Sequence, residues 1–477
     1  MSKQRILFAA SEVYPFAKTG GLADVAHALP RALAQTFDVQ VVMPLYRSIN
    51  RQKYAIEPIG EAFDISMGNS FYTIQLFGCT YGGIECRFVY SPLLCEREFL
   101  YGPPDSGYED NVIRFGIFNY AIITLLETEN YAIAHLNDWQ CGLVPLLLQD
   151  QSTIQTKTIY TIHNLAYQGT FEQTFLSALG INESYFTMEG LEFYGQINFM
   201  KAAIAYANTV TTVSPTYARE IMTKEFGCGL EGFLNIHRHK LIGVINGIDT
   251  QHFSPENDSA LIASYSDLKG KRANKSDYLK SIAFKGVNKP LFVFIGRYTW
   301  QKGMELLINT LPKIASLECN IAMFGDGESQ YCEKLQELSS MYTNIHFDVG
   351  YDEARAHRMY AAADFLLMPS LFEPCGLNQL IAFSYGAVPV VHHVGGLVDT
   401  VKRFEKFAPS SKNGFGITFE RPTQRSLFNA IGKAMDLYED KHRYNAIIKH
   451  NMSRDYSWTE SSKAYGSLYM SLLEEGK

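Results

Sequence analysis

The feature that most constrains the fold is a repeated alternation of short apolar runs with longer amphipathic segments. Each run is rich in β-branched residues and ends in a polar or glycine-bearing loop. In the first half of the chain the expected strands are RILFAA, VQVVMPL, CRFVYS, IAHLND, TIYTIHN, TVTTVS and LIGVINGID. Strands that alternate with amphipathic helices are typical of α/β proteins with parallel sheets. The pattern therefore predicts an α/β fold.

A second series of the same kind begins after a polar segment. The stretch from FSPENDSA to KGKRANKSDYLK predicts a linker followed by a helix, and further strands are expected in KPLFVFIG, CNIAMFGDG, NIHFDVGY, ADFLLMPS and AVPVVHHVGG. We predict two Rossmann-like domains, residues 1–248 and 249–458, and a C-terminal helix over 459–477 that can pack back on the N-terminal domain. Ligands of such sheets bind outside the carboxyl ends of the strands, so two domains facing each other predict a central cleft.

The loop YPFAKTGGLADV joins the first expected strand to a helix, and it places Lys18 just before Gly20 and Gly21. Glycines let backbone N–H groups approach an anion, and a helix N-terminus adds partial positive charge. The spacing matches neither the P-loop pattern nor the dinucleotide pattern G-x-G-x-x-G. The loop therefore predicts an anion site of a less common form.

Composition limits what the ligand can be. The formal net charge is −7 and the pI about 6.0, with no basic stripe, which excludes a nucleic-acid or anionic-membrane partner. The N-terminal apolar run is too short for a signal peptide and no stretch approaches a membrane span, so we expect a cytoplasmic protein. The eight cysteines form no C-x-x-C pair. We therefore predict no metal site. Because the net charge is negative, we expect any anionic ligand to be held by a few individually placed Lys and Arg side chains.

Two further loops repeat the arrangement of the first. Arg297 and Lys302 in GRYTWQKG lie across a strand end and a helix start, where two cations can grip a diphosphate. The alternative is that both are solvated surface charges. Gly395 and Gly396 in HHVGGLVDT offer backbone donors between a strand and a helix. One glycine pair is weak evidence, but three such loops at strand ends favour an anion site.

Acidic and polar candidates follow other strands. Glu373 in PSLFEPCGLNQL can accept hydrogen bonds from sugar hydroxyls or stabilise charge at an anomeric carbon, or it can simply balance a helix dipole. Cys375 is either a reactive thiol or a small packed residue. Asp138 and His163 end two strands and are expected to point into the cleft, although a strand-end histidine is often structural. Asn246 is expected in a turn that faces the same cleft.

Taken together, these stretches resemble the motifs of bacterial glycogen synthases and the related starch synthases. The matching stretches are YPFAKTGGLADV, LNDWQCGLVP, HNLAYQG, VSPTYAREI, FGCGLEG, NGID, GRYTWQKG and PSLFEPCGLNQL, followed by YGAVPVV and GGLVDTV. They stand in the family's order from Ile6 to about Trp458. The resemblance implies a GT-B architecture and a retaining glucosyltransferase. It also implies transfer from ADP-glucose to the non-reducing 4-OH of an α-1,4-glucan such as glycogen, with no cofactor.

The resemblance also assigns roles. It implies that Lys18 contacts the donor phosphate, that Arg297 and Lys302 neutralise the leaving diphosphate, and that Tyr351 stacks on adenine. Glu373 and His163 would lie at the transferred glucose, the histidine near its 6-hydroxyl. The implied catalytic residues are His163, Glu373, Asp138 (on the acceptor side), Arg297 and Lys302. The implied donor-binding residues are Lys18, Gly20, Gly21, Asn246, Tyr351, Cys375, Gly376, Leu377, Gly395, Gly396 and Leu397.

The chain departs from the family pattern in one anion loop. Where the family usually reads V-R-x-T-G-G-L, this chain has VHHVGGL, so His392 replaces an arginine and Val394 removes a hydroxyl. A histidine there would lose its charge above a pKa of roughly 6.5, which predicts weaker donor binding. Two alternatives stay open: a glycosyltransferase of the same fold that uses UDP-glucose or another acceptor, and a catalytically inactive glucan-binding protein. No pattern predicts the oligomeric state.

Overall fold

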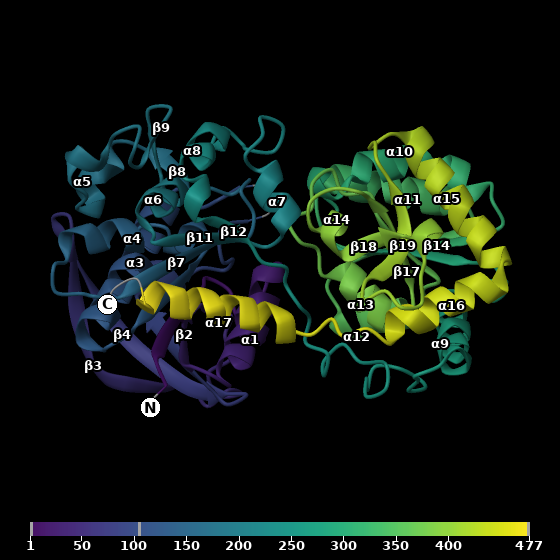
Figure 1. Cartoon of the computed structure of the whole chain (residues 1–477), viewed down its shortest axis with the longest axis horizontal. Helices are drawn as coiled ribbons and strands as arrows, with labels where there is room; N and C mark the ends of the chain where they lie inside the picture. The colour runs from purple at the N-terminus through teal and green to yellow at the C-terminus, as the bar shows by residue number, and fades with distance from the viewer. Residues whose placement is uncertain (1–2, 104–105, 475–477) are drawn as a thin grey trace. The chain divides into compact units, whose positions relative to one another are not determined.

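The computed structural model describes residues 3–103 and 106–474, and the chain divides into two compact units (Figure 1). The N-terminal unit comprises Met1–Asn246 with Trp458–Lys477, and the C-terminal unit comprises Gly247–Ser457. For comparison, the sequence predicted boundaries at 248/249 and 458/459. Among the described residues, no helix combines the length and the apolar composition that a membrane span requires.

The N-terminal unit is built on one large sheet with the strand order β12-β11-β7-β6-β1-β2-β5-β4-β3. The strands are β1 (Arg5–Ala9), β2 (Asp38–Pro44), β3 (Glu57–Met67), β4 (Ser70–Tyr81), β5 (Ile84–Tyr90), β6 (Ile133–Asn137), β7 (Lys157–Ile162), β11 (Thr209–Thr212) and β12 (Leu241–Gly243). From β12 to β5 all neighbours pair in parallel, while β4 and β3 add antiparallel pairs at one edge. The central strands are buried on both faces, which is why they read as continuous apolar runs.

Helices cover this sheet, and a small antiparallel sheet lies beside it. The helices are α1 (Gly21–Leu33), α2 (Pro92–Cys95), α3 (Asn111–Thr128), α4 (Val144–Leu147), α5 (Phe175–Leu179), α6 (Phe199–Tyr206), α7 (Pro215–Glu220), α8 (Glu231–Ile236) and α17 (Thr459–Glu474). The small sheet has the order β8-β10-β9, with β8 (Thr170–Glu172), β9 (Glu192–Phe193) and β10 (Gln196–Asn198). It follows β7 in the chain.

The C-terminal helix α17 belongs to the N-terminal unit and packs against α1. His135 of β6 anchors it: the ring bonds the Tyr469 hydroxyl through Nδ1 and the Thr161 hydroxyl through Nε2, both at 2.6 Å. Burial lowers the pKa of His135 to about 3, so the ring is neutral and donates one bond while accepting the other. Residues 475–477 of the predicted helix lie outside the described residues.

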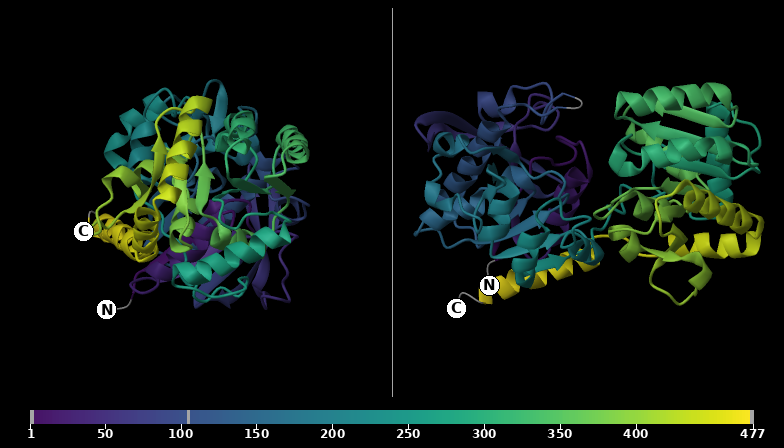
Figure 2. Two further views of the ribbon diagram at one scale, coloured as in Figure 1. Left: turned by 90° about the vertical axis from the view of Figure 1, so that its right-hand side faces the viewer. Right: turned by 90° about the horizontal axis from the view of Figure 1, so that it is seen from above.

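The C-terminal unit has a second sheet with the order β15-β14-β13-β16-β17-β19-β18, in which all neighbours pair in parallel. Its strands are β13 (Leu291–Ile295), β14 (Asn320–Gly325), β15 (Ile345–Val349), β16 (Phe365–Met368), β17 (Val388–His392), β18 (Val401–Arg403) and β19 (Gly414–Phe419). Its helices are α9 (Leu268–Ser281), α10 (Met304–Ala315), α11 (Ser329–Met341), α12 (Glu353–Ala362), α13 (Asn378–Ser384), α14 (Gly396–Thr400), α15 (Gln424–Glu439) and α16 (Lys441–Met452). Figure 2 shows helices on both faces of this sheet.

Successive residues of the C-terminal strands point to opposite faces and so build two cores. Phe292 of β13 joins the core that α10, α11 and α15 complete. The next residue, Val293, joins the core that α9, α12 and α13 complete. Burial on both faces fixes the strand register, because a slip of one residue would exchange the two sets of side chains.

Each sheet has a topological switch point, where the chain order reverses direction. In the N-terminal sheet it lies between β1 and β6, and in the C-terminal sheet between β13 and β16. Loops that leave the carboxyl ends of the strands at such a point splay apart and form a natural ligand crevice. The candidate residues Lys18, Asp138, Arg297 and Glu373 all lie in loops that follow these four strands.

The parallel strands predicted from the apolar runs are confirmed, as is the helix after the polar segment, α9. The long hairpin of β3 and β4 and the strands β8–β10, β18 and β19 were not predicted. In β3 most residues are exposed or half-buried, so the strand lacks the continuous apolar run that identified the others. It lies at the sheet edge, where one face and one row of backbone groups stay in solvent.

Candidate functional site

In the N-terminal unit, the loop after β1 is organised by a residue that the sequence analysis did not select. Glu12 is only 4% exposed, and its carboxylate accepts bonds from the Thr19 N–H at 2.5 Å, the Thr19 hydroxyl at 2.6 Å and the Gly20 N–H at 3.2 Å. The Tyr101 hydroxyl donates a further bond at 2.7 Å. Glu12 therefore holds the Thr-Gly-Gly turn in place from inside the loop.

Lys18 lies in the same loop, directly before α1. Its Nζ contacts Asp24 Oδ1 in the first turn of α1 at 2.7 Å, and both side chains are about three-quarters buried. Gly20 caps α1 in an extended conformation, and a Cβ added there would meet nothing within 4 Å. Gly21 is the first residue of the helix. Lys18 and the helix N-terminus can together hold an anion, but the N–H of Gly20 is already bonded to Glu12.

Asp138 and His163 follow the neighbouring strands β6 and β7 and contact each other. Asp138 Oδ1 accepts the His163 N–H at 2.7 Å and the Asn164 N–H at 3.4 Å. Burial raises the pKa of Asp138 to about 7, against the effect of these two donors. The residue also has a positive φ of 56°, which is strained for a side chain other than glycine. A strained carboxyl group with a pKa near neutrality is typical of functional sites.

The tautomer of His163 follows from its partner. Asn137 donates through Nδ2 to the Ala9 carbonyl at 2.9 Å, so its Oδ1 must be the atom that meets His163 Nε2 at 2.9 Å. Nε2 therefore carries the proton and donates it. Burial lowers the pKa of His163 to about 3, so the ring is neutral and Nδ1 is left as an acceptor. This ring can accept a hydrogen bond from a hydroxyl group, but it does not offer a positive charge.

Asn246 is the last residue of the N-terminal unit and is 5% exposed. Its Oδ1 is buried and has no hydrogen-bond partner among the described residues. An unsatisfied buried amide oxygen costs free energy, so such an atom calls for an explanation such as a ligand that supplies the missing donor.

In the C-terminal unit, a lysine and a glutamate form a pair across the switch point. Lys302 Nζ lies 2.7 Å from Glu373 Oε2, and the Ser370 hydroxyl donates to the same oxygen at 2.8 Å. Glu373 is 4% exposed. Among the described residues, no donor contacts its Oε1. The buried carboxylate therefore has one oxygen fixed by the protein and one oxygen left to accept a bond from a ligand.

Arg297 lies in the loop after β13, together with Lys302. Its side chain is exposed, and within 3–103 and 106–474 no hydrogen bond or ion pair engages the guanidinium. Gly303, with a φ of 71°, turns the chain from this loop into α10. A Cβ at Gly303 would lie 2.1 Å from the Pro369 carbonyl, so the loops after β13 and β16 touch at this glycine.

The loops after β16 and β17 are also joined. The Gly396 N–H donates to the Glu373 carbonyl at 2.9 Å, and a Cβ on Gly396 would meet the Cys375 backbone at 2.3 Å. Gln379 Nε2 donates to the carbonyls of Cys375 and Gly376 and bonds the Thr400 hydroxyl. These contacts place Glu373 beside the glycine pair.

The remaining residues predicted to bind the sugar nucleotide lie in or next to the loops after β16 and β17, except for Tyr351, which follows β15. Cys375 is 4% exposed and Leu397 is fully buried, so their side chains pack within these loops, and their donor-binding roles stay predictions. Gly376 has a φ of 71°, Leu377 caps α13, and Gly395 has a φ of 52° and caps α14. Tyr351 lies after the edge strand β15, and the residue is 73% exposed.

His392, which stands where the family usually has an arginine, is a buried residue in the structure. It is 6% exposed, its Nδ1 donates to the Ser370 carbonyl at 2.7 Å, and its ring stacks on Phe419. The Nδ1 bond does not test whether the ring presents a cation to the ligand, which stays a prediction. The bond holds the backbone at Ser370, whose hydroxyl in turn contacts Glu373.

The structure thus brings the predicted residues into two sets, one in each unit. The N-terminal set is Lys18, Gly20, Gly21, Asp138, His163 and Asn246, and the C-terminal set is Arg297, Lys302, Glu373, Cys375, Gly376, Leu377, Gly395, Gly396 and Leu397, with Tyr351 on the edge strand. Three supporting residues had escaped the sequence analysis: Glu12, Asn137 and Ser370. The signal that could have found them is that each is a polar residue at the end of a strand or within three residues after it.

Comparison with known proteins agrees with this arrangement. Residues 5–236 match the family described as the starch synthase catalytic domain, and residues 277–450 match glycosyl transferases group 1. The chain is 39% identical to the glycogen synthase of Syntrophotalea carbinolica, over 98% of this chain and 99% of that protein. It is 40% identical to the glycogen synthase of Aquifex aeolicus, over 98% of both.

A solved structure gives the same result for the fold. The catalytic domain of starch synthase IV from Arabidopsis thaliana, bound to ADP and acarbose, superposes with a TM-score of 0.92 at 29% identity, over 99% of this chain and 100% of that one. With identities near 40% over almost its whole length and with two Rossmann-like domains of the GT-B type, the chain belongs to the family of glycogen synthases and starch synthases and is a glycosyltransferase.

Proposed function

We propose that the chain transfers glucose from ADP-glucose to the non-reducing 4-OH of an α-1,4-glucan, with retention of the α configuration. The relatives named glycogen synthase support the reaction, and the starch synthase solved with ADP and acarbose supports the choice of nucleotide. The observation that carries the proposal is the Lys302–Glu373 pair at the switch point, with Arg297 in the same loop as the lysine.

The cations are proposed to bind the diphosphate. Lys302 and Arg297 would neutralise the charge that develops as ADP leaves, and Lys18 would add a third contact. A charge-assisted hydrogen bond contributes roughly 1.5–3 kcal/mol, which corresponds to about 10–200-fold in kcat when it is made in the transition state. Lys and Arg can perform the charge neutralisation that a metal performs elsewhere, so no metal is required in this proposal.

The sugar is proposed to contact Glu373 and His163. Glu373 Oε1 has no donor in the described part of the chain and can accept a bond from a glucose hydroxyl. The neutral ring of His163 can accept another through Nδ1. Both contacts orient the glucose without adding a positive charge beside an anomeric carbon that becomes positive in the transition state.

The transfer step is proposed to be a front-face attack. The bond from C1 of glucose to the phosphate oxygen breaks, and its electron pair leaves with ADP. The acceptor 4-OH forms the new bond to C1 on the same face and gives its proton to a phosphate oxygen of the departing ADP. Asp138 is assigned to the acceptor side, and isolation of a glucosyl adduct on Asp138 or Glu373 would refute this step.

The decisive experiment measures glucose incorporation into glycogen from ADP-glucose and from UDP-glucose, with EDTA present, between pH 6 and 8.5. We expect transfer from ADP-glucose to exceed transfer from UDP-glucose, and EDTA to leave the rate unchanged. Preference for UDP-glucose would refute the donor assignment. Glycogen binding without transfer from either donor would refute the enzymatic proposal.

A further inference from the structure

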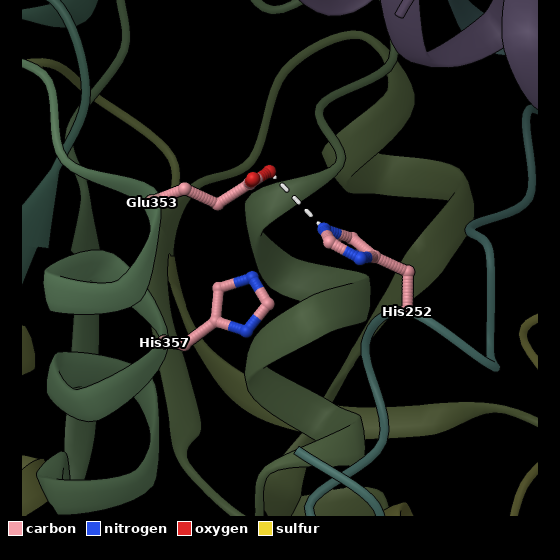
Figure 3. Close-up of side chains that lie close together, drawn as sticks. All are labelled: His252, Glu353 and His357. Atoms are coloured by element: carbon pink, nitrogen blue, oxygen red, sulfur yellow. Dashed lines mark hydrogen bonds and ion pairs between the residues drawn. The ribbon is translucent and has the colours of Figure 1, made fainter. Parts of the chain in front are cut away.

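A group of three side chains in the C-terminal unit has the composition of a metal site. His252, Glu353 and His357 each place one possible ligand atom within 4.8 Å of the other two (Figure 3). His252 Nε2 already lies 3.1 Å from Glu353 Oε1. None of these residues is assigned to the transfer reaction, so the cluster needs its own explanation.

The fold holds the three residues from two separate segments. Glu353 and His357 are four residues apart on α12, so their side chains lie on the same face of that helix. His252 belongs to the segment between β12 and α9. Asp249 Oδ1 accepts the N–H groups of Gln251 at 2.9 Å and His252 at 3.2 Å, which fixes the backbone at the histidine.

His357 is prepared to act as a ligand. Its Nδ1 lies 2.8 Å from Asp258 Oδ2, an oxygen that also accepts the Tyr385 hydroxyl at 2.6 Å. Because this carboxylate oxygen faces Nδ1 and also accepts the Tyr385 hydroxyl, Nδ1 carries the proton of the imidazole, and in the neutral ring Nε2 keeps a lone pair.

That lone pair has no protein partner. His357 is 5% exposed, and its Nε2 is a buried atom without a hydrogen-bond partner in the described part of the chain. Figure 3 shows the ring nitrogen farther from the backbone on the side that faces Glu353 and His252. A buried acceptor that points at two other ligand-type groups, and bonds nothing, is explained by a cation between them.

The donor set indicates which cation fits. Two imidazoles and one carboxylate suit Zn²⁺ and related divalent transition metals, and a carboxylate behind a histidine is the usual support of such a ligand. The His252 and Glu353 side chains are 31% and 32% exposed, so an ion can enter and water can complete its coordination. Ligand bonds of about 2.0–2.2 Å need donor atoms roughly 3.4 Å apart, which small rotations of these two partly exposed side chains would provide.

We propose that His252 Nε2, a Glu353 carboxylate oxygen and His357 Nε2 bind one divalent transition-metal ion, Zn²⁺ being the best match. The ion would tie the segment after β12 to the first turn of α12. It stabilises the C-terminal unit and takes no part in the transfer chemistry. The inference does not depend on the proposed donor or acceptor.

The test is a Zn²⁺ titration of the full chain after treatment with EDTA and its removal. Calorimetry should give one site per chain, and Zn²⁺ should raise the Tm. Co²⁺ should give the visible absorption of a low-symmetry nitrogen and oxygen site. His252→Ala and Glu353→Gln should each weaken Zn²⁺ binding by at least about tenfold, the size of effect seen even for outer-shell changes. The matched control is His442→Ala, an exposed histidine of α16, which should bind Zn²⁺ like the parent chain.

Because His357 is buried, its replacement can harm folding, and the two partly exposed ligands therefore carry the test. Far-ultraviolet circular dichroism of the metal-free variants checks that they fold. Failure of the parent chain to bind Zn²⁺ with a Kd below about 100 μM would overturn the proposal. Equal Zn²⁺ binding by the parent, His252→Ala and Glu353→Gln chains would also overturn it, because the ion would then occupy another site.

Discussion

Replacing Glu373 by glutamine keeps the shape of the side chain and removes its charge. In the native chain Oε2 accepts bonds from Lys302 Nζ at 2.7 Å and from the Ser370 hydroxyl at 2.8 Å, in a position that is 4% exposed. Glutamine can still accept both bonds, but Lys302 loses its counter-ion. Breaking a buried pair costs about 3–5 kcal/mol, and the Lys302 side chain keeps 22% exposure, so we expect a loss of about 2 kcal/mol in unfolding free energy.

The effect of Glu373→Gln on catalysis should be larger than its effect on stability. The variant presents an amide where a carboxylate would stabilise the sugar, and Lys302 no longer has a fixed position for the diphosphate. Each lost interaction of roughly 1.5–3 kcal/mol lowers kcat about 10–200-fold, so two together predict a fall of more than about 100-fold. The assay measures kcat and KM for ADP-glucose, and urea unfolding of the same samples measures stability.

The matched control is Glu405→Gln, which breaks an exposed pair with Lys433 at 2.8 Å in the same unit. An exposed pair contributes about 0–1 kcal/mol, so this variant should keep both its kcat and nearly all of its stability. A folded Glu373→Gln chain with near-normal kcat would refute the role assigned to the carboxylate. Equal kcat losses in both variants would refute the claim that the effect is local to Glu373.

Two further predictions concern pH and charge. The pKa of Asp138 is about 7 in the fold against 3.8 normally, so its contribution to stability is complete below about pH 4 and is lost as the pH rises through about 7. An asparagine does not titrate, so the free energy of unfolding of Asp138→Asn should rise by up to about 4 kcal/mol relative to that of the parent between pH 4 and pH 8. Urea unfolding of both chains across this range measures the difference, and a difference that does not change with pH would contradict the prediction. Arg297→Met should lower kcat about 10–200-fold while leaving the free energy of unfolding within about 0.5 kcal/mol, because no described residue pairs with the guanidinium; a large stability loss would show a structural role instead.

Much of the candidate site could be predicted from the sequence because its residues follow apolar runs. Lys18, Asp138, His163, Arg297 and Glu373 all lie in the loops that follow buried parallel strands. In a parallel sheet these positions gather at one edge, so a one-dimensional pattern predicts a three-dimensional neighbourhood. The resemblance to glycogen synthases and starch synthases then assigned the chemistry to each position.

The supporting contacts could not be predicted in this way. Glu12 looked like an ordinary loop residue, yet it fixes the Thr-Gly-Gly turn from inside. His392 looked like a weakened phosphate ligand, yet its ring is buried and bonds the Ser370 carbonyl. Both interpretations depended on which way one side chain points, and that direction is set by packing against neighbours distant in the sequence.

The amino-acid pattern alone was sufficient for the parallel strands, for the loops at their carboxyl ends and for the family. Strand period and burial are local properties, so they leave a signal within a few consecutive residues. The pairing of Lys302 with Glu373, the tautomer of His163, and the meeting of His252 with Glu353 across 101 residues leave no such signal. These depend on the close packing of whole elements, which brings distant side chains to within a hydrogen-bond length and decides which polar atoms are satisfied and which remain for a ligand.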